Sequence, residues 1–358
     1  MSEVSNTSIN ETYLQNGSHL DLPKDDYQVV IVILSRLQKY TNPVFCILGL
    51  LGNVIAATVF LSNSQRKTSC SLYLAARSVS DSGFLIALFV VWLSDIGIPA
   101  FNYDVICQLI IFLTYFCGFL SVWFVVALTT ENFVRICHPF SVNKYCTTKI
   151  AKIVIFAFVV IALALYNFPL WTNKVVNNNG TMVCSRIPKY DVVQQALNYT
   201  DTLLTLVIPI SIIICLMVTI TVNVIQTYHR QRRLKGNRRD NKSKNPQGQV
   251  TKMLFSVSLI FIVLNLPSHA IRVYSTVSQL VFGMTEVSVL ERSMHFAFYT
   301  LYYMNFAVNI LLYLVFGPKF REEFMRIFLR RSKQRNELTM MGSEKRTLLE
   351  SPEQVTHL

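Results

Sequence analysis

Charged residues are scarce in this chain. Aspartate, glutamate, lysine and arginine make up 15% of its 358 residues, whereas hydrophobic types make up 52%. Soluble domains carry about 25% charged residues, so the composition argues against an ordinary soluble protein. The first residues lack the charged start and apolar core of a cleavable signal peptide, and we expect the first apolar stretch to act as the insertion signal.

Catalytic and metal-binding patterns are also lacking. The apolar stretches contain no nucleophile motif and no His/Asp spacing typical of a metal site, and His269 and His295 stand isolated. We therefore expect no enzyme activity, no cofactor chemistry and no metal centre. An inverted repeat and paired broken helices, which are typical of many transporters, are not evident either. A membrane transporter remains a less favoured alternative.

Long apolar stretches are what the sequence has in abundance. Each is long enough to cross a bilayer, which takes about 20 residues. Because lipid offers no partner for unpaired backbone groups, and because the stretches do not alternate as barrel strands do, we expect helices. The predicted fold is an all-α membrane protein, a seven-transmembrane helix bundle. Its spans are Tyr40–Leu61, Ser71–Ile98, Cys107–Cys137, Ile150–Trp171, Ala196–Tyr228, Met253–Leu280 and Met294–Phe316.

Charge placement predicts the orientation of the bundle. The net charge is +13, and its surplus lies in alternate loops and the tail, as Arg66, Lys149, Arg232 and Arg331 illustrate. Such segments face the cytoplasm, which leaves the N-terminus outside a plasma-membrane protein. Glycosylation motifs agree with this topology, because they fall on the outer side. They begin at Asn6, Asn10, Asn16, Asn179 and Asn198.

This topology divides the chain into four segments. They are a glycosylated extracellular segment (1–39), the membrane domain (40–317), an amphipathic helix on the membrane surface (318–331) and a disordered cytoplasmic tail (332–358). The surface helix is expected because Phe320, Phe324 and Phe328 share one helical face. Serines and threonines of the tail are possible phosphorylation sites, which would make a receptor kinase and arrestin possible partners.

Two of the cysteines are placed for a disulfide. Of the eight cysteines, only Cys107 and Cys184 fall on the oxidising outer side of the predicted topology. We predict that they pair and tie the outer end of the third span to the loop after the fourth.

Polar residues in the middle of spans form a second candidate site, because they are costly in lipid. They are Asn53, Asp81, Ser121, Asn305 and Asn309. Asn305 and Asn309 are four residues apart and share a helical face. Together with Asp81 they could hold a sodium ion, or they could form a structural hydrogen-bond network. Arg77, one turn before Asp81, could neutralise the carboxylate, which would argue against the ion.

The motifs, in their order and spacing, resemble one receptor family. They are Gly52-Asn53, Leu74-Ala75 with Asp81, Cys107 with Cys184, Glu131-Asn132-Phe133 before Cys137-His138-Pro139-Phe140, Pro209, Pro267, and Asn309 with Tyr313. The chain is identified as a member of the rhodopsin-like (class A) G-protein-coupled receptors, and resembles invertebrate neuropeptide receptors for Phe-amide or Arg-Phe-amide peptides. This resemblance implies an extracellular ligand and a heterotrimeric G protein as partners.

The third span departs from the family pattern. Where the family has Asp/Glu-Arg-Tyr, this chain has Glu131, Asn132 and Phe133, and these residues with Tyr313 form the expected G-protein face. A receptor-like protein that binds its ligand but signals weakly is therefore an open alternative. We hypothesise that Arg77 supplies some of the missing charge.

The outer bundle indicates the class of ligand. Thr114 stands where similar amine receptors carry an aspartate, and Tyr303 where opsins carry the retinal lysine, so amines and light are disfavoured. Aromatic rings with dispersed charges suit a peptide with aromatic and basic side chains. A small-molecule chemosensory ligand stays an alternative, and the rings could also serve packing alone. The candidate contacts are Trp92, Asp95, Thr114, Tyr115, Asp201, His269, Arg272, His295 and Tyr299. Asp201 and Arg272 are favoured because neither has an evident partner.

Overall fold

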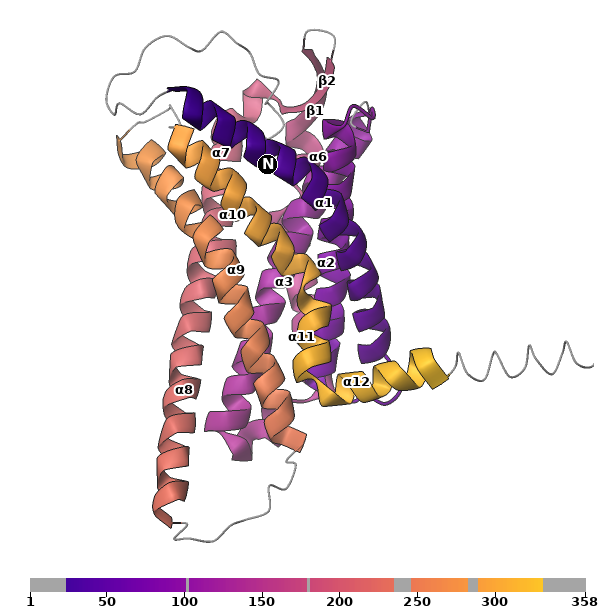
Figure 1. The fold of residues 1–358 in the computed structure, drawn as a ribbon, viewed down its shortest axis with the longest axis vertical. Helices are drawn as coiled ribbons and strands as arrows, with labels where there is room; N and C mark the ends of the chain where they lie inside the picture. The colour runs from indigo at the N-terminus through magenta and orange to yellow at the C-terminus, as the bar shows by residue number, and fades with distance from the viewer. Residues whose placement is uncertain (1–23, 101–102, 179–180, 235–245, 283–288, 331–358) are drawn as a thin grey trace, which may run out of the picture.

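The structure is a computed structural model that describes residues 24–100, 103–178, 181–234, 246–282 and 289–330. Long helices form one bundle, with a β-hairpin at the outer end and a short helix, α12, leaving the inner end at a steep angle (Figure 1). Six helices in these ranges are long and apolar enough to span a membrane, and a bent pair makes a seventh. The predicted all-α seven-transmembrane bundle is confirmed.

The helices follow the predicted spans closely. They are α1 (Lys24–Phe60), α2 (Ser69–Asp95), α3 (Asp104–Cys137), α4 (Val142–Tyr145), α5 (Thr148–Leu165), α6 (Pro169–Thr172), α7 (Asp191–Thr202), α8 (Ile208–Leu234), α9 (Pro246–Phe282), α10 (Val289–Ala307), α11 (Asn309–Phe316) and α12 (Pro318–Phe324). The fifth span comprises α7, the π-helical segment Leu203–Val207 and α8, and the bent seventh span comprises α10 and α11.

The first helix begins earlier than predicted. It starts at Lys24 rather than near Tyr40, so the end of the segment 1–39 is helical. Its outer part packs against α10, where Gln38 Nε2 donates to the carbonyl oxygen of Phe296 at 3.0 Å. Hydropathy marks only the part of a helix that lipid covers, which explains the difference. Asn6, Asn10 and Asn16 lie outside the described residues.

The bundle packs tightly inside and is apolar outside. The largest apolar cluster runs along the bundle, from Phe320 and Phe60 at the inner end to Phe168 at the outer end. Large side chains such as Phe156, 70% exposed, point outward, as lipid-facing residues do. At Gly49 a Cβ would lie 3.0 Å from the Cα of Ala307, so glycine permits the close approach of α1 and α10.

The outer end is closed by a hairpin. Strands β1 (Asn173–Asn178) and β2 (Thr181–Arg186) pair antiparallel, and Val175 N donates to Asp104 Oδ1 of α3 at 2.7 Å. A disulfide joins Cys107 to Cys184 with a Cα–Cα distance of 5.6 Å, which confirms the predicted bridge. Asn179, at the hairpin turn, lies outside the described residues.

The inner end carries the predicted surface helix as α12 and the π-helical segment Met325–Arg330. Phe320 is buried, and its ring centroid lies 5.1 Å from that of Phe60 and 5.5 Å from that of Tyr313. The helix is therefore anchored to the base of the bundle by aromatic packing. Residues 331–358, which include the predicted tail, lie outside the described ranges.

Candidate functional site

A charged cluster lies between the fifth and sixth spans in the outer half of the bundle. Arg272 Nη2 of α9 donates to Asp201 Oδ2 of α7 at 2.5 Å, and Tyr166 Oη donates to Asp201 Oδ1 at 2.9 Å. The Asp201 side chain is 5% exposed, whereas that of Arg272 is 31% exposed. The carboxylate is thus satisfied by protein groups, and Arg272 is the more exposed partner of this outer cluster.

The sequence-based interpretation of these two residues needs correction. Asp201 and Arg272 were favoured as ligand contacts because each lacked an evident partner, but they are partners of each other. A charge pair in a largely buried setting satisfies both groups, so their presence does not by itself require a ligand. What remains suited to a ligand is the exposed edge of Arg272.

Local backbone chemistry places Asp201. Pro209 has no N–H to donate within the fifth span, and the chain widens into the π-helical segment Leu203–Val207 just before it. Thr205 Oγ1 donates to the Asp201 carbonyl oxygen at 2.7 Å, and Trp123 Nε1 donates to that of Leu204 at 3.0 Å. These bonds satisfy carbonyl groups near the widened turn and fix the helix that carries the carboxylate.

Aromatic side chains extend the outer cluster. Tyr115 stacks on Tyr166 with ring centroids 5.9 Å apart, and its hydroxyl donates to Asn198 Oδ1 at 3.0 Å. Asn198 was predicted as a glycosylation site, yet its side chain points into the bundle from α7. Tyr166 and Asn198 were missed as site residues, because no sequence signal links them to Asp201.

The sixth and seventh spans add a chain of rings. His269 lies 5.9 Å from Tyr302, Tyr302 lies 6.4 Å from Tyr299, and Tyr299 stacks on His295 at 5.6 Å between centroids. His269 is 6% exposed, and its Nε2 has no hydrogen-bond partner among the described residues. Three of the predicted contacts, His269, His295 and Tyr299, are therefore joined by ring contacts through Tyr302.

Three predicted contacts are engaged elsewhere. Trp92 Nε1 donates to the Lys39 carbonyl oxygen at 2.7 Å and stacks on Phe89, so it joins α2 to α1. The Thr114 hydroxyl donates to the Ile110 carbonyl oxygen of its own helix at 2.9 Å. Asp95, the last residue of α2, is exposed. The structure does not bring these three into hydrogen-bond contact with the outer cluster.

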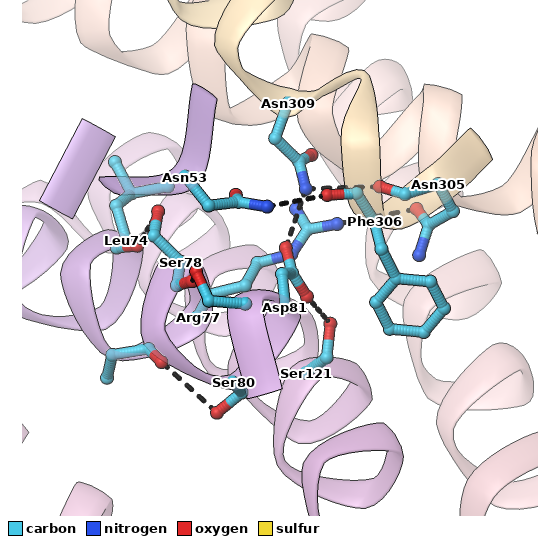
Figure 2. A network of polar contacts seen from close by, with 12 residues as sticks. Asn53, Leu74, Arg77, Ser78, Ser80, Asp81, Ser121, Asn305, Phe306 and Asn309 are labelled. Carbon is cyan, nitrogen blue, oxygen red and sulfur yellow. Dashed lines mark hydrogen bonds and ion pairs between the residues drawn. The ribbon is translucent and has the colours of Figure 1, made fainter. Parts of the chain in front are cut away.

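A second polar site, the polar core, lies deeper in the bundle and contains the predicted set (Figure 2). Asp81 is 0% exposed; its Oδ1 accepts from Ser121 Oγ at 2.5 Å and its Oδ2 from Asn309 Nδ2 at 2.7 Å. Arg77 Nε lies 3.6 Å from the same Oδ2, and Arg77 Nη2 donates to Asn305 Oδ1 at 3.4 Å. The spans contributing these residues are the second, third and seventh.

The polar core also explains a bend in the seventh span. Helices α10 and α11 meet at 52°, although Ile310 stands where the family motif has proline. Asn53 Nδ2 donates to the Phe306 carbonyl oxygen at 2.8 Å, and Asn309 Nδ2 donates to that of Asn305 at 3.1 Å. Side-chain amides thus satisfy carbonyl groups at the bend, which is a recognised alternative to a proline kink.

The side chains that were predicted to hold sodium in the polar core are hydrogen-bonded to one another. A small hard cation requires several oxygen ligands. The Asp81 carboxylate is already bonded to Ser121 and Asn309 and faces a guanidinium, and the Asn305 amide oxygen accepts from Arg77. Elsewhere, no group of three or more His, Cys, Asp or Glu side chains that could hold a metal occurs in the part of the chain that the structure describes.

The inner end of the third span has its own ion pair. Glu131 accepts from Ser69 of α2 and from Arg135, one turn further along α3. Asn132 is 0% exposed, and neither atom of its amide has a hydrogen-bond partner among the described residues. Phe133 lies beside His138, with ring centroids 5.4 Å apart, and Tyr313 is fully buried. The cation beside Glu131 is therefore Arg135.

A helix bundle with a bridged outer hairpin, a charged cluster in its outer half and a buried polar core beneath it has the architecture of a seven-helix membrane receptor. The chain belongs to the 7 transmembrane receptor (rhodopsin family), whose sequence model matches residues 52–313. This is a receptor family rather than an enzyme family.

Curated relatives of the chain are receptors named for peptides. This chain is 27% identical over 325 residues to the neuromedin U receptor homolog nmur-2 of Caenorhabditis elegans. The aligned region covers 79% of this chain and 77% of that receptor. The chain is 25% identical to the thyrotropin-releasing hormone receptor of Mus musculus, over 90% of this chain and 84% of that one. The FMRFamide receptor of Drosophila melanogaster is 24% identical over 83% of this chain and 55% of its own length.

Proposed function

We propose that the chain is a plasma-membrane receptor, with its N-terminus outside, that is activated by an extracellular neuropeptide and signals through heterotrimeric G proteins. Relatives named for neuromedin U, thyrotropin-releasing hormone and FMRFamide support a peptide ligand. The observation that carries the proposal is the outer cluster, in which the Arg272 side chain is 31% exposed and aromatic rings lie on the neighbouring spans.

The geometry favours one kind of anchor on the peptide. Asp201 is 4% exposed and bonded to Tyr166 and Arg272, so a basic side chain of the ligand would have to displace Arg272. Arg272 has further N–H donors, and its side chain is 31% exposed. A hydrogen-bond acceptor, such as a peptide carbonyl or a C-terminal amide, suits this edge better than a guanidinium does.

The cluster is also placed to report binding. Asp201 lies before Pro209 in the fifth span, and Arg272 lies after Pro267 in the sixth. A ligand that pulls on Arg272 therefore acts on both proline-bearing helices, which extend to Leu234 and from Pro246 at the inner end of the bundle. Coupling between an outer contact and an inner movement requires such an element with two arrangements.

The test is a peptide screen on intact cells that express the chain with an N-terminal epitope tag. Staining of the tag without permeabilisation checks the orientation, and ligand-stimulated second-messenger output identifies the peptide. Analogues of that peptide, in which the C-terminal amide is either replaced by a free acid or removed, then test the anchor. A peptide that activates equally well without any acceptor at its terminus would contradict the proposed anchor, and uptake of the peptide without signalling would favour a transporter.

A second candidate function rests on Asn132. Its buried amide has no partner among the described residues, where the family pattern has an arginine. A receptor that binds peptide yet couples weakly is therefore the alternative. Ligand binding without G-protein activation in the same cells would distinguish it.

A further inference from the structure

The polar core carries its own cation. Arg77 is 1% exposed and lies one helical turn before Asp81, which is 0% exposed, and the two side chains form an ion pair (Figure 2). A carboxylate away from water requires either protonation or an opposite charge nearby. Because a guanidinium is always protonated, Arg77 balances the charge of Asp81 without any bound ion.

The other polar groups that could bind a cation here already form hydrogen bonds within the polar core. Ser121 and Asn309 each donate to one oxygen of Asp81, and Asn309 does so through its amide nitrogen. The amide oxygen of Asn305 accepts from Arg77 Nη2 at 3.4 Å. A sodium ion placed here would have to displace these hydrogen bonds to reach the oxygen atoms, and it would lie beside a positive charge.

We propose that Arg77 is a tethered replacement for a monovalent cation at Asp81, and that it makes this receptor indifferent to sodium. A covalently attached cation cannot dissociate. The charge of the polar core is then independent of the ion concentrations on the two sides of the membrane. The contacts of Arg77 favour this role over one at the cytoplasmic end of the third span, where Arg135 pairs with Glu131.

The experiment uses the full-length receptor purified in detergent, and it needs no ligand. Thermal unfolding is measured in NaCl, KCl and N-methylglucamine chloride at equal ionic strength. The wild type is expected to unfold at the same Tm in all three. Arg77→Leu leaves Asp81 without its cation, and NaCl is expected to raise its Tm by about 3 °C over KCl, because an ion that binds only the folded state stabilises it.

Two variants serve as controls. Arg77→Lys keeps a tethered charge and is expected to remain indifferent to sodium. The double variant Arg77→Leu with Asp81→Asn removes both charges and is expected to lose the sodium response that the single variant gains.

Three results would overturn the proposal. The first is a sodium-specific rise in the Tm of the wild type. The second is a folded Arg77→Leu or Arg77→Gln protein that stays indifferent to sodium. The third applies if those variants are too unstable for a thermal measurement, and it is an equal yield of folded protein in NaCl and in KCl, a yield of zero in both salts included. A yield of folded protein in NaCl but not in KCl would support the proposal.

Discussion

Two arginine–aspartate pairs occupy different depths of the same bundle. The outer pair, Asp201 with Arg272, joins two helices at 2.5 Å and leaves the arginine side chain 31% exposed. The inner pair, Arg77 with Asp81, lies within one helix at 3.6 Å, and its side chains are 1% and 0% exposed. The same two residue types therefore form a partly exposed pair between two helices and a fully buried pair within one helix.

The two pairs differ in whether helix movement can change them and in whether a ligand can reach them. A pair between helices changes when those helices move relative to one another, and its open edge gives a ligand something to bind. A pair one turn apart on a single helix keeps its geometry when the bundle rearranges. We infer that the outer pair responds to the ligand, whereas the inner pair holds a constant charge.

Breaking the inner pair should have the largest effect, and it should fall on stability. Arg77→Leu leaves a buried carboxylate unpaired, which costs about 3–5 kcal/mol. In KCl we expect its Tm in detergent to fall by about 10 °C, and we expect the added change Asp81→Asn to restore most of the loss, because no buried charge then remains. A double variant as unstable as the single one would show that Arg77 acts through packing.

Breaking the outer pair should act on the ligand response instead. For Arg272→Ala we expect the potency of the cognate peptide to fall by about 100-fold, because the peptide loses its anchor and Asp201 is left buried without its cation. Dose–response curves at matched cell-surface expression measure this.

The matched controls separate anchor from scaffold. Arg272→Lys keeps the charge but loses the planar donor edge, and we expect an intermediate loss of potency. Asp201→Asn keeps the shape, and we expect a smaller loss than for Arg272→Ala, because Asp201 positions the arginine. A larger loss for Asp201→Asn would restore the idea that the carboxylate itself binds a basic group of the peptide.

A change at the cytoplasmic end should have a smaller effect than either pair. The Asn132 amide makes no hydrogen bond with the residues that the structure describes. An arginine there would lie next to Glu131 in the sequence and place a cation at the expected G-protein face. For Asn132→Arg we expect stimulated G-protein activation to rise by about fivefold, which corresponds to about 1 kcal/mol. Comparison of basal and stimulated output with that of Asn132→Gln controls for side-chain length. Unchanged output would mean that coupling does not depend on this position.

The sequence predicted those features that depend on residue type and order. Span positions follow from apolar runs, the Cys107–Cys184 bridge from the topology, and the grouping around Asp81 from the cost of polar groups in lipid. It did not predict the partner of Asp201, because Arg272 is 71 residues away and only the packing of helices brings them together.

Two other features were not predicted because a residue at another position takes the role of the residue that the family motif contains. The seventh span bends without the proline of the family motif, since Asn53 and Asn309 satisfy carbonyl groups at the bend. The charge partner of Glu131 comes from Arg135, one turn away, rather than from position 132. Comparison with the family motif shows that the proline or the arginine is missing. Only the three-dimensional structure shows which residue takes its place.

Asn198 offers the mildest test of the outer cluster. A glycan needs an amide that reaches the solvent, but Asn198 lies on a helix and accepts a hydrogen bond from Tyr115 at 3.0 Å inside the bundle. We expect Asn198→Gln to leave the electrophoretic mobility unchanged, whereas Asn179→Gln should remove one glycan. Because Tyr115 loses one hydrogen bond, peptide potency should fall by about threefold in Asn198→Gln. A mobility shift in that variant would mean that the side chain faces outward, and the ring wall next to Asp201 would then be assembled differently.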